Sequence, residues 1–157
     1  MRKLFIAAFA VLSFGLANAQ ESGFKAGAHV GLPIGTAGDA YSLNFGVDFA
    51  YMYSVSDDFK VGGTAGYTMF TGKDVNGFKF PSAGLALVGA AATYNVADSF
   101  FVGADLGYGI GVSNVTGGDI FYHPKVGYSA ETFEATLGYR GIGSGFTAVV
   151  AGFAYKF

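Results

Sequence analysis

Cysteine is absent from this chain of 157 residues. Its absence excludes disulfide bonds, thiolate metal sites and a lipoprotein anchor, which needs a cysteine at the cleavage point. The two histidines, His29 and His123, are too few for a dedicated transition-metal site. The sequence therefore predicts a fold without disulfide bonds and without a metal or another cofactor.

Charge is also scarce. Charged residues make up 13% of the chain and hydrophobic ones 52%, whereas a soluble domain has about 25% charged residues. Yet no segment after the N-terminal one has 18 consecutive apolar residues, which excludes a transmembrane helix there. In lipid every backbone polar group must be paired, and a closed barrel of short strands achieves this. The composition therefore favours a membrane β-barrel.

The first 19 residues have the three parts of a secretory signal peptide. Arg2 and Lys3 form the basic part, residues 4–12 are apolar but too short to span a bilayer as a helix, and Ala17-Asn18-Ala19 forms the cleavage site. Cleavage would leave residues 20–157, which are enough for one domain. This part has seven basic and eleven acidic residues, and its net charge of −4 argues against a nucleic-acid partner.

What the mature chain has in abundance is alternation of large apolar and small or polar residues, which is typical of strands. Eight strands are predicted, at residues 24–32, 43–53, 59–70, 83–94, 100–112, 121–128, 133–140 and 146–157. Most approach the roughly 9–11 residues of a tilted membrane strand. Residues 83–92 are apolar on both faces, so the sequence leaves the facing of the fourth strand open.

Two kinds of connection join these strands. Three short turns share one pattern, in which an aromatic residue ends one strand and another begins the next: residues 53–59, 94–100 and 128–133. The other four connections, residues 33–42, 71–82, 113–120 and 141–145, are richer in turn-forming residues and include the pair Asn76-Gly77. An up-and-down barrel would place the short turns inside the cell envelope and the other connections outside.

The short turns bring an aromatic residue of every strand to one level. A membrane barrel carries such a girdle where lipid meets water, because these rings have an apolar body and, in Tyr, a polar tip. The predicted inner girdle consists of Phe24, Tyr53, Phe59, Tyr94, Phe100, Tyr128, Phe133 and Tyr155.

The two faces of the strands distinguish a membrane barrel from a soluble one. A soluble ligand-binding barrel has its large apolar residues inside, and a membrane barrel has them outside. Here the large apolar face is continuous and free of charge, while the opposite face holds glycine, threonine and nearly all the strand charges. A soluble monomer would not expose so much apolar surface, so the sequence favours the membrane barrel.

With these features the chain resembles the small bacterial outer-membrane barrels, the group of OmpX, the OmpA transmembrane domain and OmpW. The resemblance covers residues 20–157, and its most specific part is the ending with Phe153, Tyr155 and Phe157. In that family such an ending is the signal that the barrel-assembly machinery recognises. The resemblance implies an eight-stranded antiparallel barrel in the outer membrane, in contact with lipid and lipopolysaccharide. Closure leaves no edge strand, so a monomer is expected.

The inward face gathers the ionisable residues: Lys25, His29, Asp48, Lys60, Asp105, Lys125, Glu134, Arg140 and Lys156. Buried charges must be paired. We expect Lys125 to bridge Asp105 and Glu134, and His29 to lie level with Asp48. An eight-stranded barrel is just wide enough for side chains to fill it, which favours a plugged lumen over a pathway for small solutes. The inward glycines could leave residual space.

Three functions follow as hypotheses. The first is a structural, envelope-integrity role with a mostly plugged polar lumen, and the second is a narrow OmpW-like channel for small or hydrophobic solutes. The third is a lipid A-modifying enzyme, which some members of the family are. It would use His123 near Asp119 and Ser113 at the outer rim, but a nucleophile needs its base within hydrogen-bond reach, which placement in a loop does not establish. No catalytic residue is therefore predicted.

Overall fold

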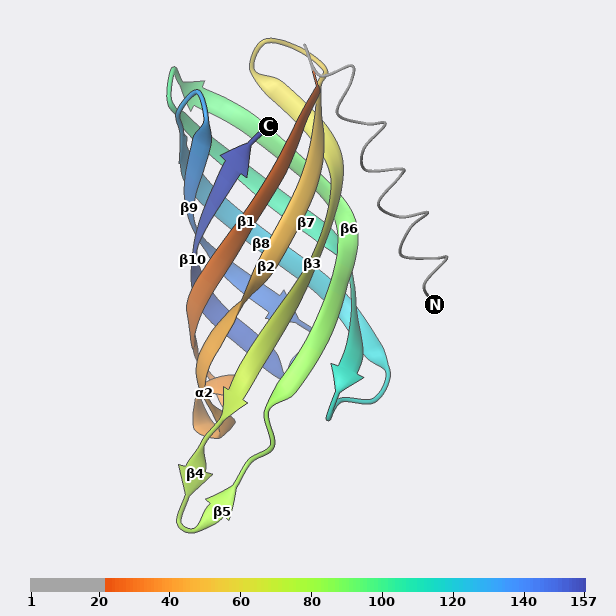
Figure 1. Cartoon of the computed structure of the whole chain (residues 1–157), viewed down its shortest axis with the longest axis vertical. Coiled ribbons are helices and arrows are strands. Elements are labelled where there is room, and N and C mark those ends of the chain that lie inside the picture. The colour runs from red at the N-terminus through yellow and green to blue at the C-terminus, as the bar shows by residue number, and fades with distance from the viewer. Residues whose placement is uncertain (1–21) are drawn as a thin grey trace.

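The computed structural model describes residues 22–157 and shows a closed antiparallel β-barrel of eight long strands (Figure 1). The strands are β1 (Ser22–Pro33), β2 (Tyr41–Ser54), β3 (Phe59–Gly72), β6 (Ala83–Ala97), β7 (Phe100–Ser113), β8 (Gly118–Ser129), β9 (Phe133–Ile142) and β10 (Phe146–Lys156). Each pairs with its neighbours in the chain, and β1 pairs with β10 to close the sheet. The predicted fold class is confirmed. The predicted signal peptide lies outside the described residues and stays a prediction.

The two ends of the barrel differ. The end predicted to face inward, called the inner end from here on, carries the three short turns and the C-terminus, and the opposite end is called the outer end. At the outer end lie the short helix α2 (Thr36–Ala40) and a small hairpin of β4 (Asp74–Val75) and β5 (Phe78–Lys79), which projects past the barrel in Figure 1. The hairpin turns at Asn76 and Gly77, whose φ angles of 53° and 81° suit a two-residue hairpin turn.

The helix α2 was not predicted, because residues 36–40 are too few to show a helical period. Its end is joined to the base of the hairpin, where the backbone N–H of Lys73 donates to the carbonyl of Ala40 at 2.8 Å. Among residues 22–157 no helix is long and apolar enough to cross a membrane.

The strand predictions hold, but several strands are longer than expected. The sixth strand was predicted from residue 121, whereas β8 begins at Gly118, because Gly118 and Ile120 still find partners in Ile110 and Tyr108 of β7. The outer connections are correspondingly shorter than the sequence indicated.

The fourth strand, β6, is apolar on both faces, and the structure settles which face points inward. Leu85 and Leu87 are buried inside the barrel, whereas Val88 and Tyr94 are 53% and 51% exposed on its outer wall. The inward leucines belong to an apolar cluster that fills the outer half of the lumen. This outer cluster consists of Phe70, Ala83, Leu85, Leu87, Phe121, Ile142, Ala148 and Val150, and Tyr41, Val115 and Phe146 pack against it.

The inward glycines make room for large neighbours. A side chain on Gly46 would bring its Cβ to 2.7 Å from Cε1 of His29, and one on Gly138 would come to 2.7 Å from Nε2 of His123. In the same way Gly127 lies under the ring of Phe101. The expectation that these glycines leave residual space is wrong at these positions, because a ring from the adjacent strand occupies the space.

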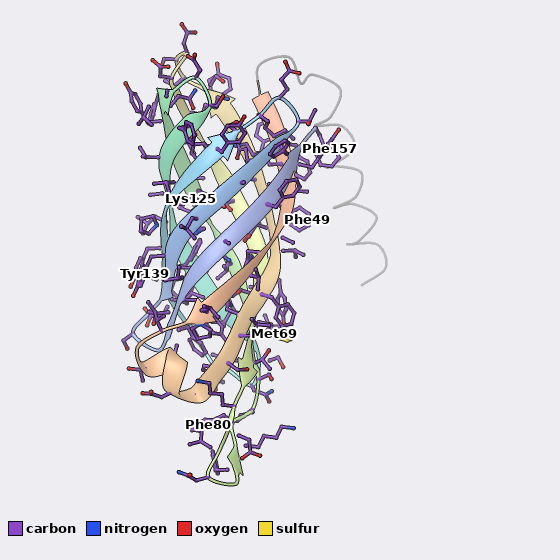
Figure 2. All side chains as sticks on the ribbon, turned by 90° about the vertical axis from the view of Figure 1, so that its left-hand side faces the viewer. Phe49, Met69, Phe80, Lys125, Tyr139 and Phe157 are labelled. Atoms are coloured by element: carbon purple, nitrogen blue, oxygen red, sulfur yellow. The ribbon has the colours of Figure 1, made fainter. Side chains whose placement is uncertain are left out.

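The outer wall carries the large apolar side chains, among them Phe49 and Tyr139, while Phe80 lies by the projecting hairpin and Phe157 at the opposite end (Figure 2). Because Phe70 is fully buried and Phe78 is 63% exposed on the hairpin, the two residues offer a matched pair of substitutions. Phe70→Ala is expected to lower the free energy of unfolding by about 3–5 kcal/mol, whereas Phe78→Ala changes it little. Urea unfolding of the refolded barrel measures both. It is followed by the near-UV signal of the tyrosines, because the chain has no tryptophan, or by gel mobility. Equal stability of the two variants would mean that the outer cluster is loosely packed.

The glycine packing generates a second prediction. Gly138→Ala would push a methyl group against His123 and against the carbonyl of Pro124, so we expect a loss of about 1–3 kcal/mol. Gly145→Ala is the control, since a Cβ at Gly145 meets nothing within 4 Å. The same unfolding experiment applies, and a Gly138→Ala variant as stable as Gly145→Ala would show that both His123 and the backbone at Pro124 move aside without cost.

Candidate functional site

The inner half of the lumen is the part of the barrel where ionisable side chains converge. Five of the predicted lumen residues are buried there, namely Lys25, His29, Asp105, Glu134 and Arg140, and the side chain of Asp48 is 32% exposed to the interior. Lys60 and Lys156 are partly exposed and lie closer to the inner mouth. The charged side chains on the inward faces of the strands therefore lie together in the inner half of the lumen, beneath the outer cluster. We call this region the polar compartment.

The centre of this compartment is Arg140, on β9. Its Nη2 donates to both carboxylate oxygens of Asp48, at 3.2 and 3.3 Å, and its Nη1 lies against the ring of His29, 2.9 Å from Nε2. The guanidinium also lies 5.8 Å from the ring centroid of Phe121, in the outer cluster. Arg140 therefore links the polar compartment to the apolar cluster above it.

His29 is fixed by partners on both sides, as its expected position level with Asp48 would allow. A carboxylate can only accept, so the 2.6 Å contact with Asp48 Oδ2 places the proton on His29 Nδ1, and Nε2 accepts from the hydroxyl of Thr68 at 3.0 Å. Thr68 Oγ1 in turn accepts from the side-chain amide of Asn44 at 2.7 Å. In this series of hydrogen bonds, each polar group therefore restrains the orientation of the next.

The order hydroxyl, imidazole and carboxylate is also that of a nucleophilic triad. Thr68 and Asn44, however, have no exposed surface, and the outer cluster lies above them. A reacting carbonyl has no access to the Thr68 hydroxyl, so the arrangement acts as a packed hydrogen-bond network.

A second group lies on β7 and β8. Lys125 Nζ donates to both oxygens of Asp105 at 2.7 Å, and His123 Nδ1 lies 3.2 Å from Asp105 Oδ2. The predicted bridge through Lys125 is only half right. Glu134 pairs with Lys25 instead, at 2.5 Å, because Lys25 on β1 reaches across β10 to β9.

His123 is placed differently from the prediction. It does not lie at the outer rim with Asp119 and Ser113, which are exposed, but points into the lumen with 4% of its surface accessible. The signal was present in the sequence, because His123 and Lys125 are two residues apart on one strand and so share a face. Its placement in the lumen removes the geometry on which the enzyme hypothesis depended.

A cavity of about 70 Å³ lies within the inner half, with Asp48, Lys125, Glu134 and Arg140 in its wall. An ordered water needs roughly 10–15 Å³ on this measure, so the cavity suits a few water molecules. Three buried polar atoms have no partner among the described residues, namely Asn44 Oδ1, His123 Nε2 and Arg140 Nε. The residues from 22 to 157 form no group of three or more His, Cys, Asp or Glu that could hold a metal ion.

The predicted inner-girdle residues lie near one another at the inner end. The ring centroids of Phe100 and Tyr128 are 5.4 Å apart, and those of Tyr128 and Phe133 are 6.2 Å apart. Across the closing seam, Phe24 and Phe157 lie 5.6 Å apart, and the N–H of Phe157 donates to the carbonyl of Phe24 at 3.0 Å. The last residue of the predicted assembly signal is therefore anchored to the first strand.

No protein-family model and no curated protein matches the chain. Solved structures do. The backbone structure of the outer-membrane protein Ail of Yersinia pestis in a bilayer nanodisc matches with a TM-score of 0.61 and 16% identity, over 88% of this chain and 100% of that one. Neisserial surface protein A matches with 0.50 and 17%, over 87% and 97%, and a de novo designed transmembrane barrel with 0.57 and 17%, over 86% and 95%. This chain has the fold of the small outer-membrane β-barrels. The fold expected from the family resemblance is confirmed.

Arg140 is the centre of the lumen network, so its loss tests how much that network stabilises the barrel. Arg140→Gln leaves Asp48 without its main cation, and a cost of about 3–5 kcal/mol in the free energy of unfolding is expected. The double variant Asp48→Asn/Arg140→Gln is expected to cost less than the sum of the single variants. Lys60→Gln is the control, because Lys60 forms no ion pair with another described residue. Additive effects in the double variant would show that the two side chains are not coupled.

Proposed function

We propose that this chain is a structural barrel of the bacterial outer membrane, with an envelope-integrity role and a lumen closed by its own side chains. The outer cluster carries the proposal, since its members Phe70, Leu85, Phe121, Ile142 and Val150 are each no more than 2% exposed. An apolar layer this dry blocks water and ions from crossing the barrel along its axis.

The outer wall supports the location. Its exposed apolar side chains include Leu32, Phe45, Val88, Leu106, Val126 and Leu137, each more than 40% exposed. A surface of this kind is stable against lipid and would aggregate in water. In that setting, outer-membrane lipid and lipopolysaccharide would surround the barrel. The barrel-assembly machinery would recognise Phe153, Tyr155 and Phe157, and closure of the sheet favours a monomer.

The narrow channel remains the second candidate, because the inner half contains a cavity with charged walls. A channel would require the outer cluster to part, since the cavity of about 70 Å³ lies beneath it. The two functions therefore differ in one measurable property, which is conductance through the resting barrel.

Single-channel recording of residues 20–157, refolded into planar bilayers, tests the proposal. Folding is verified first by the mobility shift of the unheated barrel on a denaturing gel. The wild-type barrel is expected to give no discrete conductance steps. The triple variant Phe70→Ala/Leu85→Ala/Phe121→Ala, which empties the outer cluster, is expected to conduct if it folds.

Phe78→Ala on the hairpin is the matched control and is expected to stay silent. Discrete steps in the wild-type barrel that change with Lys125→Gln or Asp105→Asn would contradict a plugged lumen and establish the channel.

The integrity role is tested separately in the native host, where loss of the chain is expected to increase uptake of a large hydrophobic dye. Re-expression of the wild-type chain should reverse this uptake.

A further inference from the structure

A shallow apolar groove runs along the outer wall at the inner end of β7, β8 and β9. Its sides are Val96, Phe100, Val102, Val126, Tyr128 and Leu137, and its volume of about 460 Å³ is within the roughly 300–1,000 Å³ of small-molecule sites. We call this hollow the inner groove. It forms because the small side chain of Ala135 stands opposite Tyr128 and next to Leu137, so the wall is recessed between large neighbours.

The end of the inner groove adjoins an acidic recess. Val96 lines the groove and also a second hollow, which is bordered by Asp58, Tyr94, Asn95, Ala97 and Asp98. We call this hollow the acidic notch. Two neighbouring inner turns form it, and the N–H of Asn95 donates to the carbonyl of Asp58 at 2.8 Å, which holds the turns together.

The carboxylates of the acidic notch are available to a ligand. Asp58 and Asp98 are exposed and form no ion pair with another described residue. Lys60 and Asp98 also line another hollow, next to the acidic notch, yet no ion pair joins these two residues. The groove thus offers an apolar track at membrane depth, and the notch offers unpaired negative charge at the level where the aromatic girdle lies.

We propose that the inner groove and the acidic notch together bind one phospholipid with an ammonium headgroup, such as a phosphatidylethanolamine. Its acyl chain lies along the groove over Ala135, and its ammonium group lies between Asp58 and Asp98. This inference rests on the proposed function, which places the inner end at the inner leaflet of the outer membrane. Lipid is the occupant because the groove faces the bilayer, and the ammonium class follows from the charge of the notch.

A lipid with a net negative headgroup fits the notch poorly, because the two carboxylates, which form no ion pair with another described residue, repel it. An exposed charge pair changes affinity by about two- to five-fold, so a preference of this size for the ammonium lipid is expected.

Native mass spectrometry of the full mature barrel, released from vesicles of equal parts phosphatidylethanolamine and phosphatidylglycerol, tests the proposal. The wild-type barrel is expected to retain one lipid, with phosphatidylethanolamine about two- to five-fold in excess. Ala135→Phe fills the groove and is expected to lose most of the retained lipid. Asp58→Asn/Asp98→Asn keeps the groove, so it should retain lipid but lose the preference.

Matched controls are available on the same barrel. Ala65→Phe adds the same ring on the outer wall of β3, away from the groove, and Asp57→Asn removes a neighbouring charge that does not line the notch. Both are expected to behave like the wild-type barrel. Equal retention of the two lipids, or an Ala135→Phe variant that retains as much lipid as Ala65→Phe, overturns the proposal. A folded barrel that does not enter vesicles at all would overturn the proposed function as well, so the two failures are distinguishable.

Discussion

The pairing of β1 with β10 is the constraint on which the rest of the structure depends. It satisfies the backbone groups that an open sheet would leave at its two edges, and with eight strands it fixes a narrow interior. Inward side chains must then fill a space of given width. Apolar residues fill it at the outer end and paired charges fill it at the inner end, and glycines stand wherever a ring from the next strand needs their place.

The two halves of the lumen stabilise the barrel by different means. The outer cluster gains free energy by burying carbon, and its contribution varies little with salt. The polar compartment gains little from burial itself, because desolvation of Arg140, Asp48 and their neighbours offsets most of the attraction between them. Its value lies in fixing one arrangement, since each group in it restrains the orientation of the next.

The sequence predicted the barrel well because period-two alternation is local and repeated in every strand. It predicted which residues point inward for the same reason, and His29 contacts Asp48 because the two lie diagonally across neighbouring strands, on the same face. Pairs that cross more than one strand were not predictable. Glu134 is bound by Lys25 rather than Lys125, and this depends on side-chain length and on the tilt of the strands, which the sequence does not show.

The outer cluster was also missed from sequence. Residues 83–92 of β6 are apolar on both faces, so alternation gives no signal there, and the inward members from other strands look like ordinary strand residues. His123 was misplaced for a different reason. It lies inside the predicted strand and shares a face with Lys125, but its closeness in sequence to Asp119 led to its assignment to the outer rim.

The partners of β1 in the lumen have a consequence for how the barrel assembles. Lys25 and His29 find Glu134 and Arg140 at separations of 109 and 111 residues along the chain. Seven strands can be in place while Lys25 and Glu134 still lie at opposite edges of the open sheet, each without the other. An incomplete barrel therefore lacks these contacts, which favours the closed barrel over partly assembled ones. The pair of Lys25 and Glu134 can form only when β10 brings β1 and β9 within reach, so a chain truncated before β10 would leave both charges without this partner.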